Sequence, residues 1–197
     1  MHTPLSDELT LGLIAGGRAS RLGGVDKAWL MRGGVPQVLR WTRRFPGEHG
    51  PVLVSTNRDH ERYTAHGLAV VGDRHPDLGP IGGLDALAQA CATPWLLTLP
   101  VDLVGVNDCL IRTLVSKHEA DGAFARDDEG AQPLVALWRA DALREACEAA
   151  IASGESAIHR MQAMMRMAEV AFAGFRFGNL NTPEDLLAAG IDPESTV

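Results

Sequence analysis

The segment from Ile14 to Lys27 holds a dense group of residues whose types could do chemistry. It contains two glycine pairs, two arginines and a lysine, in the order Gly16-Gly17, Arg18, Arg21, Gly23-Gly24 and Lys27. Paired glycines let the backbone approach a ligand closely and point several N–H groups at one anion. Guanidinium and ammonium groups supply positive charge for a polyphosphate. The segment therefore predicts a phosphate-binding loop; the alternative is a glycine-rich turn with solvated basic residues.

Known nucleotide-binding loops of two other types do not fit this segment. A Walker loop is excluded because no Gly-Lys-Ser/Thr sequence follows, and the Gly-x-Gly-x-x-Gly dinucleotide pattern cannot be placed on it. No Gly-x-Ser-x-Gly motif occurs either, which argues against an α/β-hydrolase. The seven histidines are scattered without metal-ligand spacing.

Two polar residues follow other apolar runs in the same way. Asp102 comes after the run Trp95–Leu99, and its carboxylate could hold Mg²⁺ between substrate phosphates. Asn57 ends the run Val52–Thr56, and its amide has both donors and an acceptor with which to read a base edge. The alternatives are a turn or helix-cap role for Asp102 and a cap role for Asn57.

Three further residues are candidates with weaker support from the residues alone. Asp73 precedes a loop, and a solvated turn is its alternative. Asn179 and Asn181 flank Leu180, so in an extended segment both side chains point to one side. The alternative for Asn181 is that it only helps to start the helix expected at Pro183.

The elements that must position these residues alternate between apolar runs and longer amphipathic segments. Such alternation predicts an α/β fold, a Rossmann-like three-layer sandwich around a mostly parallel sheet, in which ligands bind at the carboxyl ends of the strands. The expected strands are Leu11–Ala15, Val52–Thr56, Leu68–Val71, Trp95–Leu99, Gly122–Ala125 and Leu134–Trp138. The expected helices are Pro36–Phe45, Asp59–His66, Ile81–Ala92, Asn107–Glu119, Ala140–Ala152, Glu155–Met167 and Pro183–Ala189.

Composition excludes several classes of protein. The 197 residues suit a single domain spanning 1–197, and 46% hydrophobic with 22% charged residues predicts a packed core. The net charge of −7 and the absence of any Lys/Arg-rich run argue against a nucleic acid or an anionic membrane as partner. Three widely spaced cysteines predict buried or half-buried thiols without a disulfide framework. With no secretory h-region and no membrane-length apolar run, we expect a cytoplasmic protein.

The motifs together resemble one family. The string A-G-G-R-x-S-R-L-G-G-V-D-K at residues 15–27 is similar to the signature loop of the molybdenum cofactor guanylyltransferases (MobA-type), which have the nucleotide-diphospho-sugar transferase type of fold. The resemblance continues in the same order along nearly the whole chain, at Val54–Arg58, Gly72-Asp73, Leu78–Leu84, Leu99–Asp102, Gln132–Leu134 and Asn179–Leu186. One departure follows Asp102, where the family usually continues Asp-x-Pro and this chain has Leu103-Val104-Gly105. A looser or differently shaped backbone is expected there.

The resemblance implies transfer of GMP from GTP to the terminal phosphate of molybdopterin, with release of pyrophosphate. It implies that Asp102 is the Mg²⁺ ligand, that Asp73 contacts the nucleotide, and that Asn179 and Asn181 hold the second substrate. We expect the backbone of Ala15, Gly16 and Gly17, with Arg21 and Lys27, to bind the triphosphate. We expect the strand-end backbone near Ile14–Gly16, with the Asn57 amide, to read the base, and Arg58 to lie outside the triphosphate site. Transient contact with other proteins of cofactor biosynthesis or with acceptor molybdoenzymes is also expected.

Three alternatives stay open on the sequence. A molybdopterin cytidylyltransferase or a sugar-phosphate nucleotidyltransferase would share the logic of the loop, although the Gly16-Gly17 pair and the run from Gly23 to Lys27 look more like the guanylyl branch. A nucleotide-binding module without turnover is the third, and the presence of Lys27 together with Asp102 argues against it.

Overall fold

A seven-stranded sheet forms the centre of the protein. The computed structural model describes residues 6–16, 25–75 and 77–192. The strand order is β10-β8-β9-β6-β1-β4-β5, and β9 runs antiparallel to both of its neighbours while the other neighbouring pairs are parallel. The strands are β1 (Leu9–Ile14), β4 (Val52–Ser55), β5 (Ala69–Val71), β6 (Trp95–Pro100), β8 (Gly122–Asp127), β9 (Gly130–Arg139) and β10 (Met167–Ala171).

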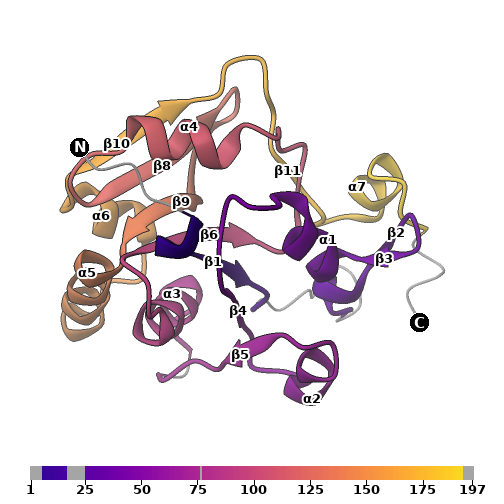
Figure 1. Cartoon of the computed structure of the whole chain (residues 1–197), viewed down its shortest axis with the longest axis horizontal. Helices are drawn as coiled ribbons and strands as arrows, with labels where there is room; N and C mark the ends of the chain where they lie inside the picture. The colour runs from indigo at the N-terminus through magenta and orange to yellow at the C-terminus, as the bar shows by residue number, and fades with distance from the viewer. Residues whose placement is uncertain (1–5, 17–24, 76, 193–197) are drawn as a thin grey trace.

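Helices cover both faces of this sheet (Figure 1). The leucines at 9, 11 and 13 of β1 pack in one apolar cluster with α1 (Gln37–Arg44), α2 (His60–Thr64) and α4 (Leu110–Lys117). The opposite face of the sheet packs against α3 (Pro80–Ala90), α5 (Ala140–Ser153) and α6 (Ile158–Ala163). Because strand side chains alternate between faces, apolar strands covered in this way form a buried middle layer. The expected three-layer α/β sandwich with a mostly parallel sheet is confirmed.

Small elements join the C-terminal segment to the edge of the sheet. Strand β7 (Leu103–Val104) pairs antiparallel with β11 (Gly178–Asn179), and α7 (Pro183–Ala188) follows. A short 3₁₀ turn, η1 (Ser6–Glu8), precedes β1, and a second, η3 (Lys27–Trp29), leads into a hairpin of β2 (Met31–Arg32) and β3 (Val35–Pro36). A separate apolar cluster links η3 to α7 through Leu30, Leu180, Leu186 and Ile191. These contacts bring residues near 27, 102 and 181 together.

Two expectations from the sequence are wrong. The helix expected over Glu155–Met167 ends at Ala163, and Met167 begins β10, which pairs in parallel with β8. The methionines around 161–167 repeat at helical spacing and so conceal the change to a strand. Cys91 and Cys147 are buried as expected, but Cys109 is exposed. Burial raises the pKa of the Cys147 thiol to about 12.

Within the described ranges, we find no helix of the length and apolar character that crossing a bilayer requires.

Candidate functional site

Four parallel strands end side by side at one edge of the sheet. Ile14 pairs with Ser55 on one side and with Pro100 on the other, and Ser55 pairs with Val71. The chain leaves the sheet just after these residues and lines a cavity of about 850 Å³. That volume suits a nucleotide-sized ligand. Its lining includes Ile14, Ala15, Gly16, Asp26, Lys27, Ser55, Thr56, Asn57, Arg58, Asp73, Gly79, Gly83, Asp102 and Leu134.

The cavity gathers most of the residues predicted from the sequence. Seven of them line it: Ile14, Ala15, Gly16, Lys27, Asn57, Asp73 and Asp102. Asn181 reaches the same place through Lys27, whereas Asn179 lies in β11 and is not part of the lining. Gly17 and Arg21, together with Arg18, fall outside the residues that the structure describes. Arg58, which we expect to lie outside the triphosphate site, also lines the cavity.

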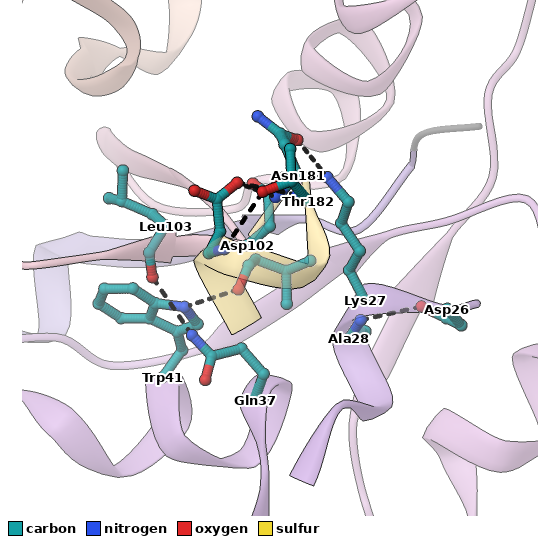
Figure 2. Close-up of polar contacts among 11 residues, drawn as sticks. Asp26, Lys27, Ala28, Gln37, Trp41, Asp102, Leu103, Asn181 and Thr182 are labelled. Carbon is teal, nitrogen blue, oxygen red and sulfur yellow. Dashed lines mark hydrogen bonds and ion pairs between the residues drawn. The ribbon is translucent and has the colours of Figure 1, made fainter. Parts of the chain in front are cut away.

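Lys27 joins two other predicted residues directly. Its Nζ lies 2.7 Å from Asp102 Oδ2 and donates a 2.6 Å hydrogen bond to Asn181 Oδ1 (Figure 2). The side chains of Lys27 and Asp102 are each 19% exposed, so solvent screens this pair only partly. Three chain segments far apart in the sequence thus place a cation between two oxygen acceptors at the mouth of the cavity.

Lys27 is positioned by its neighbour Asp26. Asp26 is the N-cap of η3 and accepts a 3.0 Å hydrogen bond from the Ala28 backbone N–H. Its other carboxylate oxygen accepts from the Tyr63 hydroxyl at 3.3 Å. Burial and the nearby Asp26 charge raise the pKa of the Tyr63 phenol well above its ordinary value, so this donor keeps its proton. Asp26, quoted above only as part of the loop, therefore fixes the turn that presents Lys27.

Asp102 is held by hydrogen bonds to the backbone on both sides of it. Trp41 Nε1 donates to the Val101 carbonyl at 3.1 Å, and Gln37 Nε2 donates to the Leu103 carbonyl at 3.2 Å (Figure 2). The Leu180 N–H donates to the carbonyl of Asp102 itself at 3.0 Å. Helix α1 and the C-terminal segment thus fix the backbone on both sides of Asp102.

We expect Trp41→Phe to lower kcat by about tenfold, because a strand end that loses its support displaces Asp102 and small misplacements are costly. The ring keeps most of its packing, but the Val101 carbonyl loses its donor, which costs about 1–3 kcal/mol of stability. Steady-state kinetics and thermal unfolding measure both effects. Trp95→Phe, a buried site at the opposite end of β6, is the matched control. An equal loss of kcat in both variants would show that α1 does not position Asp102.

Asn181 is positioned by the start of α7. The Thr182 side chain accepts from the Asp185 N–H, and Asp185 Oδ2 accepts from the N–H groups of Thr182 at 2.8 Å and Asn181 at 3.0 Å. This capping box satisfies backbone donors that the helix itself leaves free. The hydrogen bond from the Thr182 N–H is the main reason that the pKa of Asp185 lies below its ordinary value. The sequence Asn-Thr-Pro-Glu-Asp thereby fixes the residue that faces Lys27.

Asn57 and Asp73 form a reciprocal pair. Asn57 Nδ2 donates to Asp73 Oδ2 at 2.8 Å, and the Asp73 N–H donates to Asn57 Oδ1 at 2.8 Å. Each side chain therefore orients the other within the cavity lining, and neither acts as a helix cap. Among the described residues, no other partner takes the second amide hydrogen of Asn57, which leaves it for a ligand.

The N-terminus of α3 comes close to the sheet because of its glycines. A side chain at Gly83 would place Cβ 2.9 Å from Ser55 Oγ, and Gly79, which precedes the helix, has a φ of +59° that favours glycine. Gly79, Pro80 and Gly83 at the start of α3 line the cavity together with Ser55 and Thr56, and the Gly82 N–H donates to the Gly79 carbonyl at 3.1 Å. Ser55 and Thr56 carried no separate signal in the sequence because they read as the end of an apolar strand.

The oxygen atoms that accept hydrogen bonds from Lys27 are also of the type that Mg²⁺ takes as ligands. Asp102 and Asn181 each direct an oxygen at the same ammonium, so this point of the site already accommodates a cation. No group of three or more His, Cys, Asp or Glu residues suited to a metal occurs among the described residues. Magnesium in nucleotide sites takes one or two carboxylates and completes its shell with phosphates and water, so this small donor set fits it.

The fold and the cavity at the strand ends define an α/β protein with a nucleotide-sized site. The sequence model of the family described as MobA-like NTP transferase domain matches residues 12–170. A solved structure of molybdopterin-guanine dinucleotide biosynthesis protein A from Archaeoglobus fulgidus superposes with a TM-score of 0.66 at 20% identity, covering 91% of this chain and 96% of that one. The inositol-1-phosphate CTP transferase from T. maritima gives 0.68 at 12% identity, covering 92% of each chain. At these identities the likeness shows the fold.

Relatives of higher identity narrow the class. A molybdenum cofactor guanylyltransferase from Cupriavidus necator is 33% identical over 190 residues, covering 91% of this chain and 95% of the relative. One from Serratia proteamaculans is also 33% identical and covers 93% of this chain and 94% of its own. The chain is an enzyme that belongs to the molybdenum cofactor guanylyltransferase family.

Proposed function

We propose that this enzyme transfers GMP from GTP to the terminal phosphate of molybdopterin, forming molybdopterin guanine dinucleotide and pyrophosphate for molybdenum cofactor biosynthesis. Membership of the guanylyltransferase family supports this reaction. The observation that carries it is the meeting of Lys27, Asp102 and Asn181 at the nucleotide-sized cavity. These residues are the ones that the resemblance assigns to the triphosphate, the metal and the second substrate.

The reaction needs alignment and charge neutralisation rather than a general base. An oxygen of the molybdopterin phosphate is already ionised, and it attacks the α-phosphorus of GTP. The new P–O bond forms as the bond to the β-phosphate oxygen breaks, and pyrophosphate leaves with that electron pair. Positioned cations that stabilise charge on the transferring and leaving groups supply most of the catalysis in such transfers.

The first loop contributes through a few specific atoms. The Ala15 N–H donates to the Ser55 carbonyl at 2.9 Å, and the Ile14 carbonyl accepts from the Val101 N–H at 3.0 Å, so both groups are used by the sheet. Gly16 is exposed and a Cβ there would meet nothing within 4 Å, so ligand atoms can approach its backbone closely. We assign Gly16 to the triphosphate, and Ile14 and Ala15 to the wall of the nucleotide site. Gly17 and Arg21 keep their proposed roles in phosphate binding.

Lys27 and Asp102 have different electrostatic roles in our proposal. In our proposal the Lys27 ammonium binds the triphosphate and meets the charge that develops as pyrophosphate leaves. Asp102 would hold Mg²⁺, which neutralises phosphate charge when bound. Since Lys27 and Asp102 pair with each other, substrate phosphates that bind Lys27 would replace one favourable contact of the ammonium with another.

The remaining predicted residues are assigned to the nucleoside and to molybdopterin. The Asn57–Asp73 pair would contact the nucleoside, with the Asn57 amide reading the base edge. Asn181, and Asn179 two residues before it, would hold molybdopterin at the side of the site formed by the C-terminal segment. We further propose that residues 1–197 act as one domain in the cytoplasm, with transient contacts to other proteins of cofactor biosynthesis or to acceptor molybdoenzymes, and without nucleic acid or membrane partners.

Base choice tests the proposed nucleotide. Guanine presents an acceptor and two adjacent donors along one edge, whereas cytosine presents a different arrangement. A polar pocket matched to one base leaves groups unpaired with the other, at about 1–3 kcal/mol per group. We therefore expect kcat/KM for GTP to exceed that for CTP by about tenfold or more, measured as pyrophosphate release with molybdopterin as acceptor.

Two comparisons make this result specific. Asn57→Leu should erode the preference for GTP while leaving the dependence on metal concentration unchanged. A thermal-shift series with the four nucleoside triphosphates gives the same ranking independently of turnover, because a ligand of the folded state raises its melting temperature. If the enzyme used CTP as well as or better than GTP, the guanylyl assignment would be replaced by a cytidylyl one. Turnover with a sugar phosphate as acceptor would indicate a sugar-phosphate nucleotidyltransferase.

A further inference from the structure

A second cavity lies behind the strand end that carries Asp102, on the side of α1. It has a volume of about 540 Å³ and lies between α1, the β2–β3 hairpin and residues 103–108. We call it the arginine groove, because four arginines line it: Arg32, Arg40, Arg43 and Arg44. Asp108 is the one carboxylate among the lining residues that the structure describes.

The positive charge in the arginine groove is poorly balanced by the protein. Arg44 pairs with Asp108 at 2.8 Å, but in the described part of the chain no carboxylate pairs with Arg32, Arg40 or Arg43. Burial, followed by the charges of Arg40 and Arg44, lowers the pKa of the Arg32 guanidinium. Four guanidinium groups against one carboxylate leave three positive charges in one cavity of a protein whose net charge is −7. Like charges held together in this way repel unless an anion joins them.

A buried polar atom at the arginine groove also lacks a partner. Gln37 lines the groove and is 2% exposed, and its Oε1 is buried without a hydrogen bond to any described residue. Leaving such an acceptor unsatisfied costs free energy, so a donor that reached it through a small movement of the groove lining would relieve the cost. The Gln37 Nε2 end is fixed on the Leu103 carbonyl (Figure 2).

We propose that the arginine groove is a second binding site, separate from the nucleotide cavity, for a small phosphate-bearing molecule that also carries a hydrogen-bond donor. Guanidinium forks match the oxygens of phosphate in geometry and charge, and three unbalanced positive charges suit a multiply charged phosphate better than a single carboxylate. A nucleic acid is disfavoured because it needs an extended basic surface rather than one cavity on an acidic protein.

The arginine groove is connected to the active site through its own lining. Gln37 and Trp41 both line the groove, and both donate to the backbone carbonyls that flank Asp102. A ligand that binds Gln37 Oε1 therefore changes the hydrogen bonds that position the backbone around Asp102. Occupancy of the groove thereby changes the rate of catalysis. The site itself does not depend on which nucleotide the enzyme uses.

Two-dimensional NMR of the tryptophan indole N–H groups tests this proposal. The chain has four tryptophans, and the Trp41 signal is assigned with Trp41→Phe. Pyrophosphate, titrated into the whole protein at millimolar concentrations without nucleotide, should shift the Trp41 signal saturably. Arg32→Gln combined with Arg40→Gln should weaken that binding by at least about tenfold, the scale of losing charge-assisted hydrogen bonds. Lys27→Ala, which impairs the nucleotide cavity, should leave the Trp41 response in place.

The control removes the same charge elsewhere. Arg160 and Arg166 are exposed, each pairs with one acid, and neither lines the groove, so replacing both by Gln should leave the titration unchanged. The signals of Trp29, Trp95 and Trp138 report whether each variant is folded. If the double variant at 32 and 40 is unfolded, Arg43→Gln, at an exposed position, takes its place.

Three results would overturn the proposal. One is the absence of a saturable Trp41 shift, and another is equal weakening in the groove variant and the Arg160/Arg166 control. The third is tighter binding of a glutamate-rich peptide than of pyrophosphate, abolished by the groove variant, which would make the groove a docking surface for an acidic protein.

Discussion

Asp102→Asn is expected to lower guanylyl transfer by at least about a hundredfold, the scale of losing one major electrostatic element of a catalytic site. The substitution keeps the shape of the side chain and removes the charge that would hold Mg²⁺. Lys27 keeps its second acceptor, Asn181 Oδ1 at 2.6 Å, so the local structure should persist. Pyrophosphate release under saturating substrates measures the loss, and thermal unfolding should stay near the wild-type value.

The control for this variant is another carboxylate that is paired but exposed. Asp141 lies 3.1 Å from Arg139 with its side chain 61% exposed, and Asp141→Asn removes the same unit of charge at the opposite edge of the sheet from the cavity, where Arg139 pairs with Trp95 at the start of β6. Exposed ion pairs contribute at most about 1 kcal/mol, so we expect neither activity nor stability to change appreciably. Turnover near the wild-type rate in Asp102→Asn would remove Asp102 from the mechanism.

The sequence predicted the edge of the sheet at which the site forms, because strand ends can be read directly. Apolar runs that stop before Gly16, Asn57 and Asp102 imply parallel strands, and parallel strands bring their carboxyl ends to one edge. The resemblance added Asp73 and Asn181, which no periodicity would have selected. The three-layer arrangement followed from the same alternation of runs.

The contacts within the site could not be predicted, because they join segments that are remote in the sequence. Lys27 and Asn181 are separated by 154 positions, and their hydrogen bond depends on the packing of α7 against η3. Trp41 and Gln37 read as ordinary residues of an amphipathic helix, yet their polar ends support the backbone around Asp102. The pairing of Asn57 with Asp73 joins the segments that follow two different strands, β4 and β5, so it could not be predicted from the sequence either.

The arginine groove could not be predicted from the sequence for a related reason. Arg40, Arg43 and Arg44 lie within one short segment on α1, and Arg32 lies apart from them in a hairpin, so the sequence does not show that the four share a cavity. A helix that ends in Arg43-Arg44 also has an ordinary explanation in the favourable placement of cations at a helix C-terminus. Only the folded hairpin brings Arg32 to the same cavity.

Lys27→Ala is the second substitution with a large expected effect. The ammonium binds the triphosphate in the ground state and meets more charge as pyrophosphate leaves, so its loss should raise the KM for GTP and lower kcat together. We expect kcat/KM to fall by about a hundredfold or more, comparable to removing a preorganised donor. The variant also leaves the oxygens of Asp102 and Asn181 without their shared donor. The change in the KM for GTP distinguishes this variant from Asp102→Asn.

The chain offers a matched control because it contains only two lysines. Lys117 is exposed in the last turn of α4, and Lys117→Ala should leave both kinetic constants unchanged. An amine-reactive probe gives a second readout on the unmodified protein, since GTP should protect Lys27 and leave Lys117 reactive. Equal labelling of Lys27 with and without GTP, together with an unchanged KM in Lys27→Ala, would place the triphosphate elsewhere in the cavity. The pair of Lys27 with Asp102 would then be a structural ion pair.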